Sequence, residues 1–371
     1  MRWGPNRAPV DAGLERWVVG PVRTTTAADG WRGIEADVDG TPVRIEARDV
    51  ELVPRPEAIA TAVAPAAAVL GAQLVLEEPV DAGWWAGVEQ AAGMLATWHD
   101  ATPVRPAVVA PRTRAPRPRR RAVPPGVAQC FTGGVDSFWT LRHGGVAPSH
   151  LVYVVGFDVP LDDTARVADQ LATLDAVAAA AGGQRPLAVR SDLRSHPHAN
   201  RVTWGWLHGG ALAGVGHALA GVVGTLVIPP SNPEGRLMPL GSHPALDPLW
   251  SRPGALAIRH CSTTLPRVER LRALVDDPLA QAHLHVCWEH REPGPNCGRC
   301  EKCLRTMAML AGLGALDRFG TFPAVEDMPA AIATLGPMGD LYRNMWADVL
   351  DLPLPPALHD VVRTVLLAPV T

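Results

Sequence analysis

Short apolar runs alternate with longer amphipathic segments in the chain from residue 127 onward. The runs have the length of buried β-strands and stand at 127–131, 150–158, 186–193 and 225–230. Helices are predicted to begin at Ser137 and to cover about 164–181 and 202–223. Buried strands that alternate with helices are typical of a doubly wound parallel sheet, so we predict an α/β domain over residues 127–320.

The first hundred residues carry different signals. Residues 34–47, "IEADVDGTPVRIEA", alternate around an Asp-Gly pair, a pattern that predicts a β-hairpin. Asp81 is placed to cap a helix with one apolar face, which consists of Trp84, Val88, Ala91, Leu95 and Trp98. This face is predicted to lie in the core, with a partner surface as the alternative. We therefore predict a small α+β domain over residues 1–101 and, after the sheet, a C-terminal helical extension over 321–371.

Residues 102–126 are rich in proline and hold six arginines between positions 112 and 121. Proline opposes regular structure, so this segment is predicted to be an extended linker. No aromatic side chains interleave the arginines, and the net charge of the whole chain is only −3. Without interleaved aromatics a solvated tether is expected rather than a nucleic-acid partner; a nucleic-acid contact of this segment is the alternative, and the net charge argues neither way.

Lysine occurs once in the chain, at Lys302. A Walker A loop needs a Gly-Lys-Ser/Thr sequence, and none is present. A protein-kinase or Schiff-base lysine could only be Lys302. Any phosphate chemistry is therefore expected to depend on arginines, backbone amides and a metal ion.

The N-terminal residues include no apolar signal core, so we expect a cytoplasmic protein. Residues 207–228 are apolar, close to membrane length, and contain a Gly-x-x-x-Gly spacing. His208 and His217 interrupt this stretch, and its end has the pattern of a helix that runs into a buried strand. We therefore expect no membrane span.

The segment "FTGGVDSF", residues 131–138, lies where the first predicted strand of the sheet meets the first helix. Glycines let the backbone approach an anion, and the free amides and dipole of a helix start favour negative charge. Thr132 and Ser137 add hydroxyl donors, and Asp136 is suited to hold Mg²⁺ beside the phosphates. We expect a nucleotide here; the alternative is an ordinary glycine turn before a helix. The loop comprises Thr132, Gly133, Gly134, Val135, Asp136 and Ser137.

A cluster of cysteines near the C-terminus has the spacing of a structural zinc site. Two overlapping Cys-x-x-Cys units follow one upstream cysteine, which gives the set Cys287, Cys297, Cys300 and Cys303. Four thiolates would complete the tetrahedron and leave no open position for catalysis. His290 in place of Cys287 is the alternative fourth ligand. A disulfide is not expected in a cytoplasmic chain.

The phosphate loop resembles the Ser-Gly-Gly-x-Asp-Ser motif of the PP-loop ATP-pyrophosphatase superfamily, with Thr132 in place of the first serine. The order of the loop and the cysteines resembles the 7-cyano-7-deazaguanine synthase family, whose Cys-x₈-Cys-x₂-Cys-x₂-Cys pattern has a first gap one residue shorter. The resemblance covers roughly residues 127–315. It implies an adenine nucleotide alpha-hydrolase-like fold with bound ATP, Mg²⁺ and Zn²⁺.

The resemblance also implies a reaction. Enzymes of this family convert a carboxylate into an adenylate and release pyrophosphate from ATP, after which ammonia attacks. Asp136 and Ser137 would serve this step, and the arginines near the phosphates are expected to be Arg194 and Arg267. Adenine is expected near the end of the second strand, at Phe157 and Asp158, although Phe157 is equally suited to the core.

Residues 239–251, "PLGSHPALDPLWS", follow the fourth strand and are expected to form a substrate lid. The lid residues would be Gly241, Ser242, His243, Asp247 and Trp250; the alternative is a proline-rich loop held by local hydrogen bonds. This loop departs from a deazapurine site, so we expect another small-molecule, peptide or protein carboxylate, attacked by ammonia or an amine. Two other functions stay open: tRNA thiolation, and a non-catalytic nucleotide-binding scaffold. A homodimer also stays open.

Overall fold

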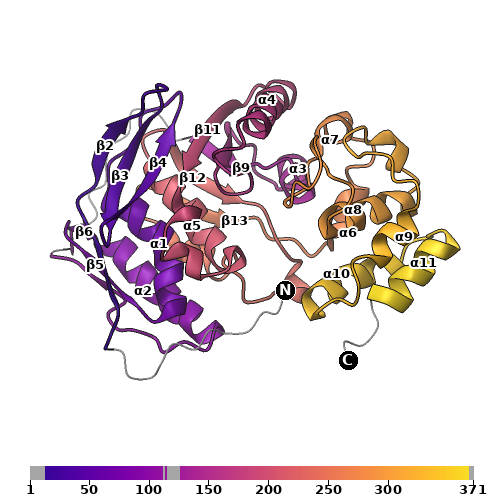
Figure 1. Ribbon diagram of the computed structural model, residues 1–371. Coiled ribbons are helices and arrows are strands. Elements are labelled where there is room, and N and C mark those ends of the chain that lie inside the picture. Colours follow the sequence, from indigo (N-terminus) through magenta and orange to yellow (C-terminus); the bar gives the residue numbers. More distant parts are fainter. Residues whose placement is uncertain (1–12, 112, 115–125, 367–371) are drawn as a thin grey trace.

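The computed structural model describes residues 13–111, 113–114 and 126–366. Within these residues, eleven strands form one continuous sheet in the order β13-β12-β9-β10-β11-β4-β3-β1-β5-β7, with β2 beside β3 (Figure 1). The parallel half consists of β9 (Gly126–Cys130), β10 (His150–Val155), β11 (Arg185–Ser191), β12 (Val223–Ile228) and β13 (Ala257–His260). The connecting helices are α3 (Val135–His143), α4 (Thr164–Ala180) and α5 (Trp204–Ala218).

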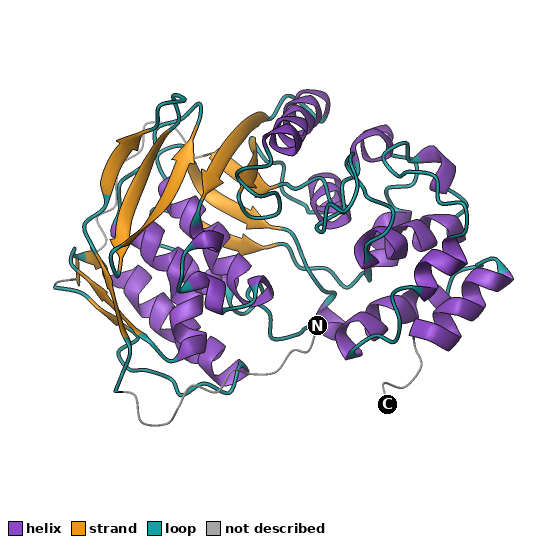
Figure 2. Cartoon of the chain, in the orientation of Figure 1, coloured by secondary structure: helices purple, strands orange, loops and turns teal. Residues whose placement is uncertain are grey.

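The order of the parallel strands places a topological switch point between β9 and β12. Numbered along the chain, these five strands follow the order 3-2-1-4-5 of a Rossmann-like sheet. Helices lie on both faces, with α4 and α5 on opposite sides (Figure 2). The predicted α/β class and mostly parallel sheet are therefore confirmed. In such sheets ligands bind beyond the carboxyl ends of the strands at the switch point.

Two helices differ from their predicted bounds. The helix expected from Ser137 begins at Val135, because Gly134 already stands at its N-cap. The helix expected over 202–223 covers only Trp204–Ala218, and the chain then turns into β12, with the N–H of Val222 bonded to the carbonyl of Leu219 at 2.8 Å.

The N-terminal part contains β1 (Arg16–Val19), β2 (Arg23–Thr26), β3 (Arg32–Val38), β4 (Thr41–Ala47), α1 (Pro56–Leu70), β5 (Gln73–Leu76) and α2 (Ala82–Trp98). The predicted hairpin is confirmed as β3 and β4, which meet at Asp39 and Gly40, both with positive φ as the tight turn requires. The predicted cap is also confirmed, since the Asp81 carboxylate accepts the N–H groups of Gly83 and Trp84. The apolar face of α2 lies in the core.

The N-terminal part is joined to the parallel sheet. β4 pairs antiparallel with β11, with Ala47 opposite Val189, and α1 packs along α5. One apolar core extends across both parts. The boundary predicted at residue 101 stays a prediction, but the N-terminal residues share a sheet and a core with the α/β part.

The predicted linker is partly regular. β7 (Val108–Val109) pairs in parallel with β5, and β8 (Thr113–Arg114) pairs with β6 (Val80–Asp81). The residues between the prolines keep their backbone N–H groups. Glu89 on α2 accepts the N–H groups of Ala107 and Val108 at 3.0 and 2.8 Å, which fixes this part of the segment. This corrects the expectation of a wholly irregular segment. The arginines at 117–121 lie outside the described residues.

The C-terminal part is helical and lies at the opposite end of the molecule from β5 and β6 (Figure 1). Its helices are α6 (Arg267–Arg272), α7 (Pro278–His283), α8 (Glu301–Gly312), α9 (Met328–Ala333), α10 (Asp340–Leu350) and α11 (Pro356–Val361). A second apolar core joins these helices to α3, α4 and the other face of the sheet.

The apolar stretch at residues 207–228, which is about as long as a membrane span, consists of most of helix α5 and of strand β12, and glycines let α5 pack closely in the interior. In α5, a Cβ atom at Gly210 would stand 2.4 Å from the ring of Pro65, and one at Gly214 would stand 2.6 Å from the carbonyl oxygen of Ala58. The Gly-x-x-x-Gly spacing thus lets α5 contact α1 closely. Among the described residues, no helix has the length and apolarity needed to cross a membrane.

Replacement of Gly214 by alanine is expected to lower the free energy of unfolding by about 1–3 kcal/mol, because the added methyl group must push α1 and α5 apart. Thermal denaturation measures this effect. Gly205→Ala in the first turn of the same helix is the control, since its Cβ has no neighbour closer than 3.9 Å. Equal melting temperatures for the two variants would contradict the close helix contact.

Candidate functional site

The predicted phosphate loop lies at the switch point, between β9 and α3. Gly133 has φ +77°, a conformation that strains other residues, and a Cβ atom there would also stand 3.4 Å from the His283 carbonyl oxygen and the His285 Cβ. Ser137 Oγ accepts the N–H of Thr132 at 3.2 Å and lies 3.3 Å from its hydroxyl oxygen. The loop thus presents a helix N-terminus with two clustered hydroxyl groups.

Two arginines of α6 hold Asp136, in the first turn of α3. Arg267 Nη2 donates to Asp136 Oδ2 at 2.6 Å, and Arg270 Nη1 donates to Oδ1. The Arg270 side chain is 1 % exposed and also donates to the carbonyl of Pro230 at 2.9 Å. The predicted arginine Arg267 is therefore at the site. Sequence reasoning missed Arg270, although its position three residues after Arg267 puts both on one helix face.

The charge of Asp136 is stabilised by its neighbours. Burial raises the pKa of this carboxyl group, but the positive charges of Arg267, Arg270 and Lys302 outweigh burial, so the net pKa is lowered. Both carboxylate oxygens are engaged by guanidinium groups. Asp136 can hold a phosphate-bound Mg²⁺ only if an arginine moves to another partner, such as a phosphate oxygen.

Lys302, in the first turn of α8, is a further charged residue of this region. Burial, followed by the positive charge of Arg267, lowers the pKa of its ammonium group, while Asp158 and Asp136 act in the opposite direction. The chain's one lysine therefore lies close enough to the phosphate loop to influence Asp136. The sequence identified Lys302 as the one lysine of the chain but did not place it near the phosphate loop.

The predicted adenine segment follows β10. Phe157 is buried and packs on Trp204, with ring centroids 4.8 Å apart, while Asp158 is half-buried. Arg194 donates to the Phe157 carbonyl and lies over the Trp204 ring, with its Cζ 5.0 Å from the ring centroid. The structure therefore places Arg194 at the predicted adenine segment, whereas Arg267 is the predicted arginine bonded to Asp136.

The four predicted cysteines form a cluster that could hold a metal ion such as zinc. Their Sγ atoms all lie within 4.8 Å of one another, and all four residues are buried. Cys287 and Cys300 are 3.9 Å apart at sulfur, as are Cys297 and Cys303. A tetrahedral zinc ion with zinc–sulfur bonds of about 2.3 Å needs sulfur atoms about 3.8 Å apart, so the spacing fits.

Backbone donors also suit thiolate ligands in this cluster. The N–H groups of His290, Cys300 and Cys303 each point at the sulfur of a cysteine three residues earlier, at 3.3–3.4 Å. Hydrogen bonds from the thiols of Cys300 and Cys303 lower the pKa of Cys287. The described residues thus group Cys287 with the other cysteines, whereas the ring of His290 is not part of the set.

The cysteine segment supports the phosphate loop directly. The N–H of His285 donates to the carbonyl of Gly133 at 2.8 Å, and the His285 Nδ1 lies 2.6 Å from Gln170 Nε2 on α4. Asn296 accepts the N–H groups of Val286 and Cys287, which fixes the stretch of chain between the loop and the cluster. A metal bound to the cysteines would therefore hold the backbone beside Gly133.

The expected substrate lid, residues 239–251, is anchored by buried residues, among them Ser242, Asp247 and Trp250. Asp247 is 0 % exposed and accepts from Ser242 Oγ at 2.7 Å, while His260 Nδ1 lies 2.8 Å from the same carboxylate. Trp250 is also 0 % exposed, and a Cβ at Gly241 would stand 2.4 Å from the backbone of Trp206. His243 is half-buried, with its ring edge on Trp98. This burial favours a structural role, because polar groups satisfied by one another resemble a lid in the sequence.

Asp247→Ala is expected to lower the free energy of unfolding by about 2 kcal/mol or more, since Ser242, His260 and the N–H of His243 would lose their acceptor. Chemical denaturation measures the change. Asp162→Ala, at an exposed position before α4, is the control. A lid residue would instead leave stability unchanged and weaken substrate binding, an outcome that would contradict the structural role.

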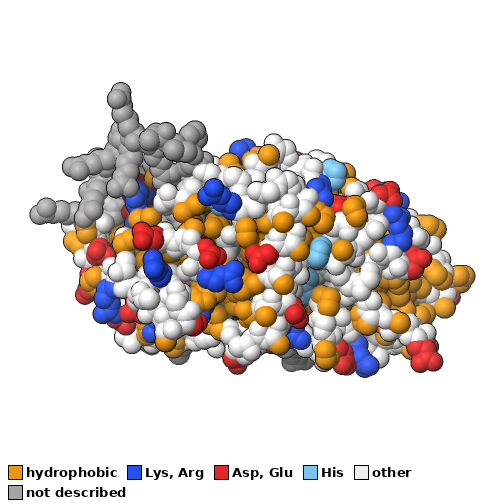
Figure 3. All heavy atoms as spheres, turned by 90° about the horizontal axis from the view of Figure 1, so that it is seen from above, with side chains coloured by type: hydrophobic (Ala, Val, Ile, Leu, Met, Phe, Trp, Pro, Cys, Tyr) orange, Lys and Arg blue, Asp and Glu red, His pale blue; other side chains and the backbone are white. Residues whose placement is uncertain are grey.

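Comparisons of the chain with protein-family models, with curated proteins and with solved structures found no match. Function is therefore inferred from the site itself. On the face shown in Figure 3, basic side chains lie among acidic ones and form no continuous basic surface among the described residues.

Proposed function

We propose that this chain is an ATP-dependent enzyme of the PP-loop type, which adenylates a carboxylate for attack by ammonia or an amine. The observation that carries the proposal is the loop at the switch point, where a helix N-terminus, clustered hydroxyl groups and an arginine-held aspartate meet. The adjacent four-cysteine cluster adds a second feature expected of 7-cyano-7-deazaguanine synthase-like proteins.

The chemistry needs no protein nucleophile. One oxygen of the substrate carboxylate attacks the α-phosphorus of ATP, and the bond to the β-phosphate oxygen breaks, so pyrophosphate leaves with the electron pair. The amine nitrogen then attacks the acyl carbon, loses a proton and expels AMP. Mg²⁺ bound with the nucleotide would neutralise phosphate charge, with Asp136 as its protein ligand.

The chain's own groups are suited to orient the phosphates. The α3 amides and the hydroxyl groups of Thr132 and Ser137 would bind phosphate oxygens, and Arg267 and Lys302 would balance the charge of the departing pyrophosphate. Phe157 and Asp158 would border the adenine. In this proposal the zinc is structural, because four thiolates leave no position for a reacting group.

Thiolation by sulfur transfer fits the site less well. It requires a thiol that a sulfur donor can reach, whereas all six cysteines of the chain are buried. Four of these six belong to the closed cluster. A measurement of pyrophosphate release distinguishes an enzyme from a scaffold that only binds nucleotide.

The test is pyrophosphate release from ATP and Mg²⁺ with a panel of carboxylic acids that includes 7-carboxy-7-deazaguanine, each with and without ammonia. We expect release that depends on one acid, together with AMP formed in equal amount. ATP binding without release for any acid, including peptides and proteins with free carboxylates, would favour the scaffold. Absence of ATP binding would overturn the proposal.

A further inference from the structure

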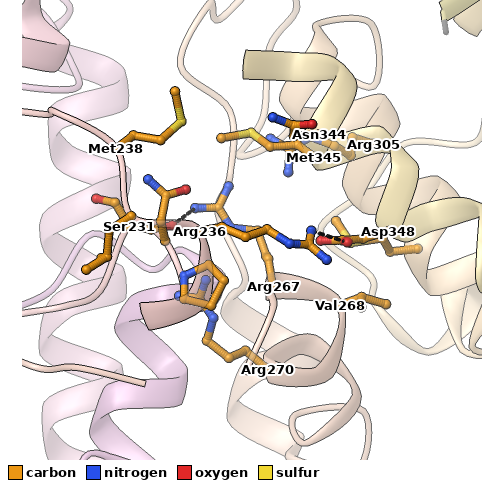
Figure 4. Close-up of a pocket in the computed structure, with 14 residues that line it drawn as sticks. Ser231, Arg236, Met238, Arg267, Val268, Arg270, Arg305, Asn344, Met345 and Asp348 are labelled. Atoms are coloured by element: carbon orange, nitrogen blue, oxygen red, sulfur yellow. Dashed lines mark hydrogen bonds and ion pairs between the residues drawn. The ribbon is translucent and has the colours of Figure 1, made fainter. Parts of the chain in front are cut away.

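A cavity of about 360 Å³ lies between the loop after β12, helix α6 and helix α10 (Figure 4). Arg236 crosses it from the loop and donates to Asp348 of α10. Trp346 Nε1 donates to Glu301 at 2.9 Å, which ties α10 to α8. The cavity therefore has a wall supplied by the C-terminal extension, whose role the sequence left unassigned.

Arginines dominate the polar part of this cavity. Arg236, Arg267, Arg270 and Arg305 line it, and their carboxylate partners are Asp348, Asp136 and Glu301. Four guanidinium groups thus face three carboxylates. The excess of one positive charge favours a ligand with a single negative charge.

Two of these arginines keep unused donors. The Nε atoms of Arg267 and Arg270 are buried and have no hydrogen-bond partner within the described part of the chain. Arg270 is 0 % exposed as a residue, so its unused donor is deep in the structure. A buried donor without an acceptor is costly, so the guanidinium groups are not fully satisfied by this chain. The Arg267 side chain is 18 % exposed, so a ligand carboxylate in the cavity would bind to Arg267.

The rest of the cavity is apolar. Its apolar lining consists of Leu237, Met238, Val268, Met309 and Met345. Methionine side chains adapt to ligands of irregular shape because they are unbranched and polarizable. The volume lies at the lower end of small-molecule sites, which span roughly 300–1,000 Å³. The chemistry is thus that of an apolar body attached to one anionic group.

We infer that this cavity binds the substrate as a monocarboxylic acid with an apolar body, with its carboxylate on Arg267, whereas the fully buried Arg270 supports the site from behind. The fate of that carboxylate, though not its binding, depends on the proposed function. Arg267 also holds Asp136, so the acid would lie directly beside the phosphate loop. The lining residues come from the 231–238 loop, α6, α8 and α10, and none of them belongs to the 239–251 segment.

The test measures acid binding to the full chain by calorimetry, without ATP. The probes are 4-phenylbutyrate, indole-3-propionate and octanoate, each compared with its neutral amide. We expect the acids to bind, the amides to bind more than about tenfold more weakly, and Met345→Trp to weaken acid binding by a similar factor because the indole fills the cavity. Met328→Trp on α9, which lies outside the cavity lining, is the matched control.

A second variant and a melting experiment distinguish a filled cavity from a misfolded protein. Met238→Trp fills the cavity from the opposite wall, and thermal melting of both variants verifies that they are folded. Absence of binding by every acid, or binding unaffected by both folded variants, would overturn the inference. Acid binding that both variants block, without pyrophosphate release for any acid of the panel described above, would support the cavity and count against the proposed function alone.

Discussion

Asp136→Asn is expected to lower acid-dependent pyrophosphate release by about 100- to 1,000-fold, the usual effect of removing one preorganised charge from a site. The variant keeps the shape of the side chain but loses the charge that Arg267 and Arg270 share. Mg²⁺ brought by ATP would also lose its carboxylate ligand. The measurement is initial rate against ATP concentration with the acid that the panel identifies.

Stability must be measured beside activity for this variant. Arg270 is fully buried, and removal of the charge of its partner leaves it poorly compensated, at a cost of about 3 kcal/mol. Rates are therefore compared well below the melting temperature. Asp169→Asn, on the exposed face of α4, is the matched control. A folded Asp136→Asn protein that releases pyrophosphate at the normal rate would remove Asp136 from the mechanism.

Cys300→Ser is expected to abolish metal binding and to unfold the segment around residues 285–303. Structural zinc sites contribute about 10–16 kcal/mol of apparent binding energy in small domains, so loss of one of four ligands is severe. The His285 N–H would no longer be held against the Gly133 carbonyl, and affinity for ATP should fall with it. Metal content by mass spectrometry and ATP binding by calorimetry measure the two effects.

Cys261→Ser provides the control for this experiment. Cys261 is also a buried thiol, but it lies outside the cluster and contacts the carbonyl of Gly144. Its replacement should leave metal content and nucleotide affinity at the wild-type values. A metal-free Cys300→Ser protein that binds ATP as well as the wild type would show that the cluster does not support the loop.

Local patterns predicted the correct elements where neighbours in the sequence decide the structure. The hairpin at Asp39 and Gly40 depends on φ values that only a few residue types tolerate, and the cysteine cluster depends on closely spaced cysteines within one short segment. The parallel strands β9 to β12 and the helices between them followed from their periodicity, whereas β13 and the strands β1, β2, β5 and β7 were not predicted. These features could be predicted because no distant segment was needed.

Features created by distant segments could not be predicted. Arg270 joins the site only because α6 packs against α3, and the cavity exists only because α10 lies opposite the 231–238 loop. For the 239–251 segment the sequence predicted a substrate lid, whereas the structure favours a structural role. Its polar side chains satisfy one another in the interior, and the sequence alone does not distinguish such a network from an exposed lid.

The pairing of β4 with β11 joins segments far apart in the chain, so it can form only late in synthesis. Ala47 can meet Val189 only after the phosphate loop and two further strands have left the ribosome. Until then the hairpin has an open edge, which is a site for aberrant pairing with other chains. Nascent chains should therefore depend on chaperones between completion of the hairpin and emergence of β11, and ribosome-bound intermediates cut short before residue 191 should be the most prone to aggregate.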